Sequence, residues 1–151
     1  MDQNIKLICF DLNKTLIKEN SWEILNLGLG ISEAEDDIML QWYREGIITY
    51  NKWQELIKDI YIKRGKASKK NIESILAHHT YCEGALELIS YLSAKGYTIV
   101  LISSSIDIIV KIVASELNIK YSFSNNHFNF DENGYLVDII TEGDEKEIKA
   151  K

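Results

Sequence analysis

Four stretches of this chain carry the hydrophobic pattern of β-strands. Residues 5–11 are mostly apolar and predict the first strand. Residues 97–102 form a nearly continuous apolar run rich in β-branched side chains, as expected for a strand that is buried on both faces. Residues 121–130 and 134–140 predict two shorter extended segments. An Asp-Glu-Asn-Gly turn at residues 131–134 joins these two segments, since Asn-Gly readily adopts the positive φ angles of a hairpin turn.

Two helices are predicted between these strands. Residues 84–95 carry an apolar stripe and are followed by Gly96, a common residue just past a helix end. Residues 106–117 carry a similar stripe. The positions of the first helix expected to face inward are Leu86, Ile89 and Leu92. This alternation of strands and helices predicts an α/β fold.

The segment from about residue 20 to residue 79 is helical in pattern throughout. Asn20 and Ser32 each precede a Glu by three residues, which is the capping-box arrangement at a helix start. A further helix is predicted from an i, i+3, i+4, i+7, i+8 stripe, and Ser68 opens another. The stripe consists of Trp53, Leu56, Ile57, Ile60 and Tyr61. We therefore expect a small helical bundle between the first strand and the rest of the α/β pattern.

Composition narrows the functional classes. The chain has 151 residues with 46% hydrophobic and 26% charged side chains, so it should fold as a globular α/β domain with a small insert. The net charge of −6 and the absence of a long basic stripe argue against nucleic-acid binding. No apolar run reaches membrane-spanning length and no signal peptide opens the chain. Cys9 and Cys82 fit a reducing compartment, so we expect a cytoplasmic protein without nucleic-acid or membrane partners.

Chemically active side chains follow the first strand. Asp11 ends the apolar run, Asn13 lies two residues later, and Thr15 lies four residues later. The strand delivers Asp11 to its carboxyl end, where open α/β sheets place ligand sites. Asp11 can serve there as a nucleophile or a cation ligand, while the turn directs backbone N–H groups and the Thr15 hydroxyl toward the same place. The alternative is that Asp11 and Thr15 only cap a turn.

A second candidate element lies at residues 102–107, where a strand is expected to end, three serines follow, and a helix begins. Helix N-termini bind anions because they present free N–H groups and partial positive charge. Ser103 is expected at the strand tip, where its hydroxyl and the following amides, including that of Ser104, can hold a phosphoryl oxygen. Alternatively, these serines only cap the helix.

Together these motifs resemble those of the haloacid dehalogenase superfamily. Its first motif is Asp-x-Asp-x-Thr after a hydrophobic strand, and its second is a Ser between a strand and a helix. The helical insert after the first motif resembles the cap of the phosphoserine-phosphatase-like branch. The resemblance implies a Rossmann-like parallel sheet core made of residues 1–17 and 80–151, with an inserted helical-bundle cap made of residues 18–79.

The resemblance also implies a Mg²⁺-dependent phosphomonoester hydrolase or phosphotransferase that acts through an aspartyl phosphate on Asp11. Mg²⁺ would bind Asp11 and the backbone carbonyl of Asn13. Thr15, Ser103 and Ser104 would hold the phosphate of a small phosphorylated substrate.

A lysine near the start of a later helix completes the phosphate site in this superfamily. Lys149 fits this role best by spacing, and Lys146 competes with it. The acidic residues interleaved with these lysines leave open a simpler interpretation, in which both lysines lie on a solvated face.

Two departures from the superfamily pattern affect the expected activity. Asn13 stands where the hydrolases carry a second Asp, and an amide cannot act as a general acid or base, a loss of roughly 10²–10⁴-fold. The fourth motif is absent, so the core is expected to be incomplete at its C-terminus. We therefore expect a fragment, a natural truncation completed by another chain, or a degraded protein. An unpaired edge at residues 5–10 would favour self-association.

Substrate recognition also departs from the phosphoserine phosphatases. Their amine-binding Glu and carboxylate-binding Arg would fall at Asn20 and near Glu55, neither of which matches, so this chain is not predicted to hydrolyse phosphoserine. Several aromatic residues could instead line a cap pocket for a larger or more apolar substrate, although bundle core is the alternative for some of them. They are Trp22, Trp42, Tyr43 and Trp53.

Two other functions are considered, of which the first stays open and the second is disfavoured. The chain could be a catalytically silent relative that binds a phosphorylated ligand or a partner protein. A receiver-like phosphoacceptor that uses Asp11 for signalling is disfavoured, because the helical insert has no place in that fold.

Overall fold

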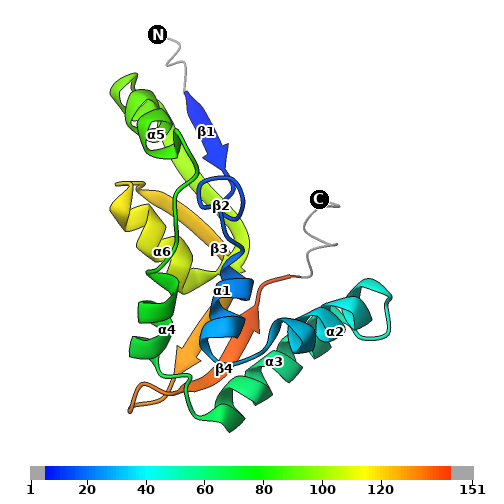
Figure 1. Cartoon of the computed structure of the whole chain (residues 1–151). Coiled ribbons are helices and arrows are strands. Elements are labelled where there is room, and N and C mark those ends of the chain that lie inside the picture. Colours follow the sequence, from blue (N-terminus) through cyan, green and yellow to red (C-terminus); the bar gives the residue numbers. More distant parts are fainter. Residues whose placement is uncertain (1–5, 144–151) are drawn as a thin grey trace.

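The computed structural model describes residues 6–143, and this part of the chain contains four strands and six helices (Figure 1). The strands are β1 (Leu7–Phe10), β2 (Thr98–Ile106), β3 (Tyr121–Phe130) and β4 (Leu136–Thr141). The helices are α1 (Ser21–Gly28), α2 (Glu33–Arg44), α3 (Tyr50–Arg64), α4 (Lys69–Leu76), α5 (Ala85–Ala94) and α6 (Asp107–Glu116).

The strands form one mixed sheet in the order β1-β2-β3-β4. β1 pairs with β2 and β2 pairs with β3 in parallel, whereas β3 and β4 form an antiparallel hairpin. Gly134 takes a φ of 81° in the hairpin turn, which a glycine adopts without strain. The predicted α/β class with a mostly parallel sheet is confirmed. Within residues 6–143, β1 lies at one edge of this sheet.

The second strand is longer than its sequence predicts. β2 does not end at Ile102 but continues through the three serines to Ile106, with an irregularity in its pairing with β3 after Ser103. The polar groups of this extension are hydrogen-bonded to one another and to side chains of other elements. The Ser105 N–H donates to Ser103 Oγ at 3.3 Å, the Ser105 hydroxyl bonds that of Ser21, and the Asn126 side chain donates to the Ser104 carbonyl at 2.7 Å.

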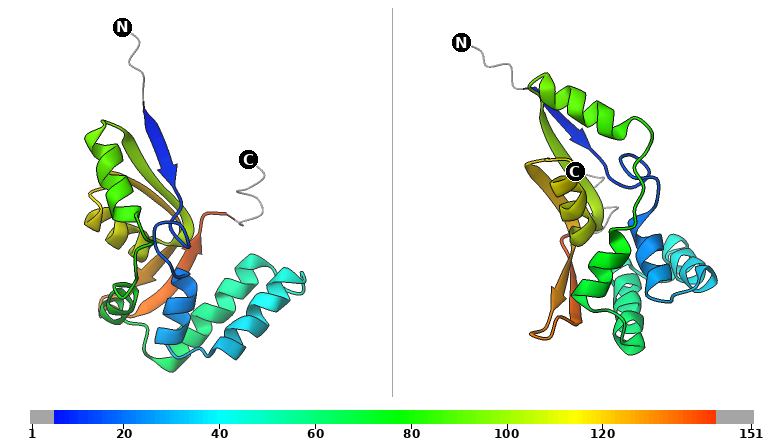
Figure 2. Two further views of the ribbon diagram at one scale, coloured as in Figure 1. Left: turned by 45° about the horizontal axis from the view of Figure 1, so that its top comes forward. Right: turned by 60° about the vertical axis from the view of Figure 1, so that its left-hand side comes forward.

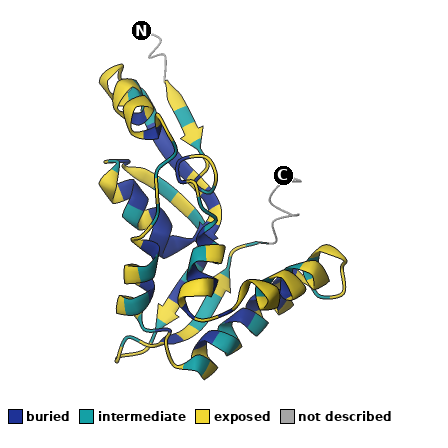
Figure 3. Ribbon diagram, viewed as in Figure 1, coloured by how far each residue is buried: buried dark blue, intermediate teal, exposed yellow. Residues whose placement is uncertain are grey.

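The core lies mainly between the sheet and the helices that pack on it, and Figure 3 shows the buried residues concentrated there. Helix α5 is rotated relative to its predicted orientation: Ala85 and Ile89 are buried, while Leu86 is half exposed, so the expected inward position of Leu86 is wrong. Cys9 is likewise exposed, because its strand forms an edge of the described sheet.

The predicted helical block between the first two strands is present as α1–α4. Ser32 opens α2 with a complete capping box, in which the Glu35 N–H donates to Ser32 Oγ and the Ser32 N–H donates to the Glu35 carboxylate at 2.8 Å. Asn20 caps α1 by accepting from the Trp22 N–H at 3.0 Å. These helices gather beyond the carboxyl end of β1, with α2 and α3 side by side (Figures 1 and 2).

Candidate active site

Asp11 is the first residue after β1, and a tight turn follows it. The buried Leu12 anchors this turn, because its carbonyl accepts the N–H groups of residues 15, 16 and 17 at 3.0–3.3 Å. Lys14 takes a φ of 57°, a conformation that costs free energy for a residue with a side chain. The Asp11 carboxylate accepts only from the neighbouring Leu12 N–H at 2.7 Å among the bonds of the described residues, and Asp11 stays exposed. The turn thus presents a carboxylate at the carboxyl end of the strand.

Asn13 fastens this turn to the first helix of the insert. Its Oδ1 accepts from the Ser21 N–H at 3.1 Å, at the first residue of α1. Because Oδ1 is the acceptor, the Asn13 Nδ2 group is left as a donor on the other side of the amide. Ser21 is itself buried and bonds the Ser105 hydroxyl of β2. The chain after β1, the start of α1 and the end of β2 are therefore held together.

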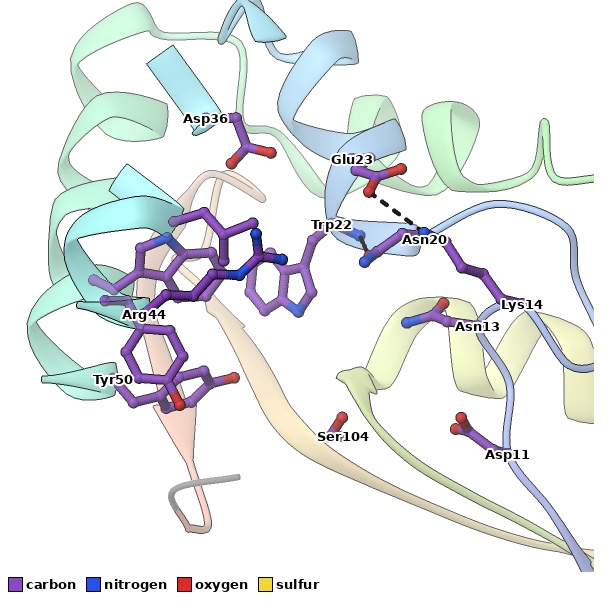
Figure 4. Close-up of a pocket in the computed structure, with 13 residues that line it drawn as sticks. Asp11, Asn13, Lys14, Asn20, Trp22, Glu23, Asp36, Arg44, Tyr50 and Ser104 are labelled. Atoms are coloured by element: carbon purple, nitrogen blue, oxygen red, sulfur yellow. Dashed lines mark hydrogen bonds and ion pairs between the residues drawn. The ribbon is translucent and has the colours of Figure 1, made fainter. Parts of the chain in front are cut away.

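A cavity of about 610 Å³ lies where these segments meet the helices. On the sheet side it is lined by Asp11, Asn13 and Ser104, which come from two segments about ninety residues apart in the sequence (Figure 4). Its volume is in the usual range for small-molecule sites, roughly 300–1,000 Å³. The other described residues that line it are Lys14, Asn20, Trp22, Glu23, Asp36, Leu40, Tyr43, Arg44, Tyr50 and Trp53.

Other candidate phosphate-binding residues lie outside this lining. Ser103 is buried, and its Oγ already accepts from Ser105, while its exposed neighbour Ser104 reaches the cavity. Thr15 is exposed on the turn. Lys146 and Lys149 lie outside the described residues.

The insert supplies an aromatic wall to the cavity. Trp22, Tyr43 and Trp53 line it, together with Tyr50. Trp22 and Trp53 meet edge to face with ring centroids 5.4 Å apart, and Tyr50 stacks on Trp53 at 5.6 Å. Trp42, the other aromatic residue considered from the sequence, is exposed and does not line the cavity.

Charged residues of the cavity went unrecognised in the sequence. Arg44 ends α2 and extends into the cavity (Figure 4), and Asp36 and Glu23 also line it. The spacing of the phosphoserine phosphatases predicts an arginine near Glu55 on α3, whereas the arginine that lines this cavity is Arg44 at the end of α2. A usable signal was present, since Arg44 directly follows two aromatic residues at the end of an amphipathic helix.

The carboxylates at this end of the cavity have partners. Glu23 pairs with Lys14 at 3.9 Å, and Asp36 accepts from Asn26 Nδ2 at 2.7 Å. Partial burial raises the pKa of Asp36, with the hydrogen bond from Asn26 opposing the shift and the nearby Asp37 and Glu23 charges adding to it. Arg44 forms no ion pair with any residue in 6–143. Among the described residues, Arg44 and Asp36 are thus two cavity charges that have no ion-pair partner.

The motifs and the fold converge on one family. A family model of haloacid dehalogenase-like hydrolases matches residues 8–150, which is most of the chain. The chain belongs to this family. This haloacid dehalogenase-like chain is also similar to the phosphoserine phosphatase of Methanocaldococcus jannaschii, with 28% identity over 129 residues, which cover 83% of this chain and 57% of that protein.

Solved structures agree with this placement. A phospho-aspartyl intermediate analogue of phosphoserine phosphatase superposes with a TM-score of 0.70 at 23% identity, covering 91% of this chain and 63% of that one. A substrate-bound phosphoserine phosphatase complex gives a TM-score of 0.72 at 22% identity, with coverage of 93% and 65%. A haloacid dehalogenase family hydrolase of Salmonella enterica gives 0.73 at 23% identity, with coverage of 88% and 44%. The resemblance to the phosphoserine-phosphatase-like branch is confirmed, and the chain spans less than two thirds of the length of each of these relatives.

Two further findings bear on what this part of the chain can bind. Residues 6–143 contain no helix that is long and apolar enough to cross a membrane. The same residues hold no group of three or more His, Cys, Asp or Glu side chains arranged to bind a metal ion.

Proposed function

We propose that this chain carries the phosphoryl-transfer site of a phosphomonoester hydrolase that acts through an aspartyl phosphate on Asp11. The observation that carries the proposal is the exposed Asp11 carboxylate, which lies after β1 and lines a cavity with Asn13 and Ser104. This is the strand end at which α/β sheets bind ligands. The family membership and the similarity to phosphoserine phosphatases support a phosphorylated small molecule as the substrate.

Each residue of the site has a defined part in this chemistry. An Asp11 carboxylate oxygen bonds phosphorus while the bond to the leaving oxygen breaks, and the electron pair departs with that oxygen. The hydroxyl groups of Thr15, Ser103 and Ser104 would donate to the phosphoryl oxygens, and Lys149 would add a positive charge. Among the described residues of this set, Ser104 lines the cavity. Ser103 uses Oγ as an acceptor toward Ser105 and keeps its own O–H available as a donor.

Magnesium fits the donor groups of this turn. Asp11 offers an exposed carboxylate, and the backbone carbonyl of Asn13 is the second oxygen that we propose as a ligand. Mg²⁺ favours such sites, in which one or two carboxylates are completed by waters and substrate phosphate oxygens. When bound, Mg²⁺ would neutralise negative charge on the phosphoryl group.

We further propose that residues 18–79 act as a cap over this site. Helices α1–α3 contribute most of the cavity lining, and the Asn13–Ser21 bond ties the start of α1 to the catalytic turn. A cap excludes water and selects the leaving group.

Asn13 limits the activity. An amide neither protonates a leaving alkoxide nor removes a proton from water, so both steps lose general acid–base catalysis. For this reason the second candidate function is a silent relative that binds a phosphorylated ligand without turning it over. The Asn13 side chain is held in position because its Oδ1 accepts from the Ser21 N–H. An Asp at this position would keep that hydrogen bond with one carboxylate oxygen and leave the other oxygen available.

Comparison of this chain with Asn13→Asp tests the proposal. Hydrolysis of an alkyl phosphate should rise by roughly 10²–10⁴-fold in Asn13→Asp, while hydrolysis of an aryl phosphate should rise less, because phenolates leave without a proton. The double variant Asp11→Asn, Asn13→Asp is the matched control and should be inactive. Equal gains for both substrate classes would show that residue 13 is not the acid. No turnover in Asn13→Asp, with retained binding of orthophosphate, would favour the silent relative.

A further inference from the structure

The cavity changes character from one end to the other. Asp11, Asn13 and Ser104 form a polar end on the sheet side, whereas the insert contributes aromatic rings to the opposite end. Trp53 and Tyr50 are almost fully buried and are held against each other, so they form a firm support. Trp22 and Tyr43 lie on this support and are only partly buried. The partly buried Trp22 ring therefore offers surface to a flat apolar group in the cavity.

Two donors at the aromatic end have no partner within residues 6–143. The Arg44 guanidinium extends into the cavity and forms no ion pair with the described residues (Figure 4). The buried Trp53 Nε1–H has no hydrogen-bond acceptor there either, which is unusual for a buried polar group. Glu23 is paired with Lys14, and Asp36 accepts a hydrogen bond from Asn26. The position beside Arg44 thus favours a group that is flat and also negatively charged.

The polar end restricts the leaving group independently. Asn13 lines this end, and in the proposed function its position is the one from which a leaving oxygen would be protonated, a proton that an amide cannot supply. A phenol with a pKa of about 10 leaves as its anion far more readily than an aliphatic alcohol, whose pKa is much higher. The chemistry of Asn13 and the aromatic wall therefore point to the same kind of leaving group.

We propose that the preferred substrate class is an aryl phosphate whose ring carries an anionic group on the side away from the phosphate. This inference rests on the proposed function and specifies its substrate. The ring lies against Trp22, and the anionic group binds Arg44. In the chemical step, an Asp11 oxygen bonds phosphorus, the bond from phosphorus to the aryl oxygen breaks, and the phenolate takes a proton from water after departure.

Binding measurements on the whole chain test this without requiring turnover. Isothermal titration calorimetry with Mg²⁺ would compare phenyl phosphate, 4-carboxyphenyl phosphate and O-phosphoserine. The 4-carboxyphenyl phosphate should bind about tenfold more tightly than phenyl phosphate, as expected for one added ion pair in a partly enclosed site. O-phosphoserine should bind at least about tenfold more weakly than 4-carboxyphenyl phosphate. Arg44→Gln should abolish the advantage of the carboxylate, and Arg44→Lys should keep most of it.

Tryptophan fluorescence locates the binding. The chain has three tryptophans, and Trp42 lies outside the cavity, so Trp42→Phe leaves only Trp22 and Trp53, which both line it. Aryl phosphates should change the emission of this variant as they change that of the parent.

The inference is overturned if O-phosphoserine binds as tightly as the aryl phosphates, or if Arg44→Gln leaves the preference for the carboxylate unchanged. The experiments distinguish failure of this substrate class from failure of the proposed function. Aryl phosphates that bind through Arg44 and never phosphorylate Asp11 would overturn the catalytic proposal alone. Phosphorylation of Asp11 by an acyl phosphate, with no binding of aryl phosphates, would overturn the substrate class alone.

Discussion

Replacing Asn126 by alanine should strongly destabilise the protein, although Asn126 lies far from Asp11 in the sequence. Asn126 lies on β3 and is fully buried. Its Nδ2 donates to the Ser104 carbonyl at 2.7 Å, and its Oδ1 accepts from Thr141 at 2.9 Å and from Gln54 of α3. One side chain thus connects the serine segment of the candidate site with both the hairpin and the insert.

The size of the effect follows from which groups lose their partners. Without Asn126, Gln54 Nε2 keeps the Tyr50 hydroxyl at 3.2 Å, and the Thr141 hydroxyl keeps Gln54 Oε1 as an acceptor. The Ser104 carbonyl loses its Asn126 donor, which costs about 1–3 kcal/mol for a buried acceptor. The space left by the amide adds to this, so we expect a loss of about 2–4 kcal/mol in the free energy of unfolding.

Urea denaturation followed by circular dichroism measures this loss. Asn129→Ala is the matched control, because Asn129 lies on the same strand and is exposed, and its cost should stay within about 0.5 kcal/mol. Asn126→Asp keeps the shape and the acceptor but cannot donate to Ser104, so it should be destabilised as well. Equal stability of the Asn126→Ala and Asn129→Ala variants would refute the connecting role of Asn126.

Two further predictions concern charge and the sheet edge. Burial raises the pKa of Asp36 in the folded state. The contribution of Asp36 to folding stability is therefore fully present below the unfolded pKa of 3.8 and is lost as the pH rises through the raised value. Asp36→Asn should therefore stabilise the protein at pH 7 and have little effect near pH 3. Urea denaturation at the two pH values measures this, and a variant that is less stable than the parent at pH 7 would contradict it. Leu7 of the edge strand β1 is 53% exposed, so we expect self-association that Leu7→Lys reduces in light scattering, and an unchanged particle size would exclude this edge as the contact.

Local signals in the sequence predicted most of the elements. The Ser32–Glu35 capping box and the Asn-Gly turn at residues 133–134 each act within a few residues, so the pattern alone contains the information. The stripe around Ile57 and Tyr61 succeeded for the same reason, since both residues are fully buried.

Long-range contacts account for what the sequence did not reveal. β2 extends through the serines because Asn126 and Ser21, far away in the chain, satisfy the polar groups there. Arg44 reaches the cavity because α2 and α3 fold back together over the carboxyl end of β1, and no local pattern encodes that return. The same limit applies to Leu86, whose exposure depends on how α5 rotates against β2.

In the proposed function, Asp11 accepts a phosphoryl group from the substrate. Incubation of the chain with an acyl phosphate and Mg²⁺, followed by borohydride reduction of the aspartyl phosphate and peptide mapping by mass spectrometry, tests it directly. We expect a single reduced site at Asp11 that is absent in Asp11→Asn. The aspartyl phosphate should accumulate before reduction, because Asn13 cannot activate water. A modification that persists in Asp11→Asn, or one that maps to Asp36 or Asp107, would contradict it.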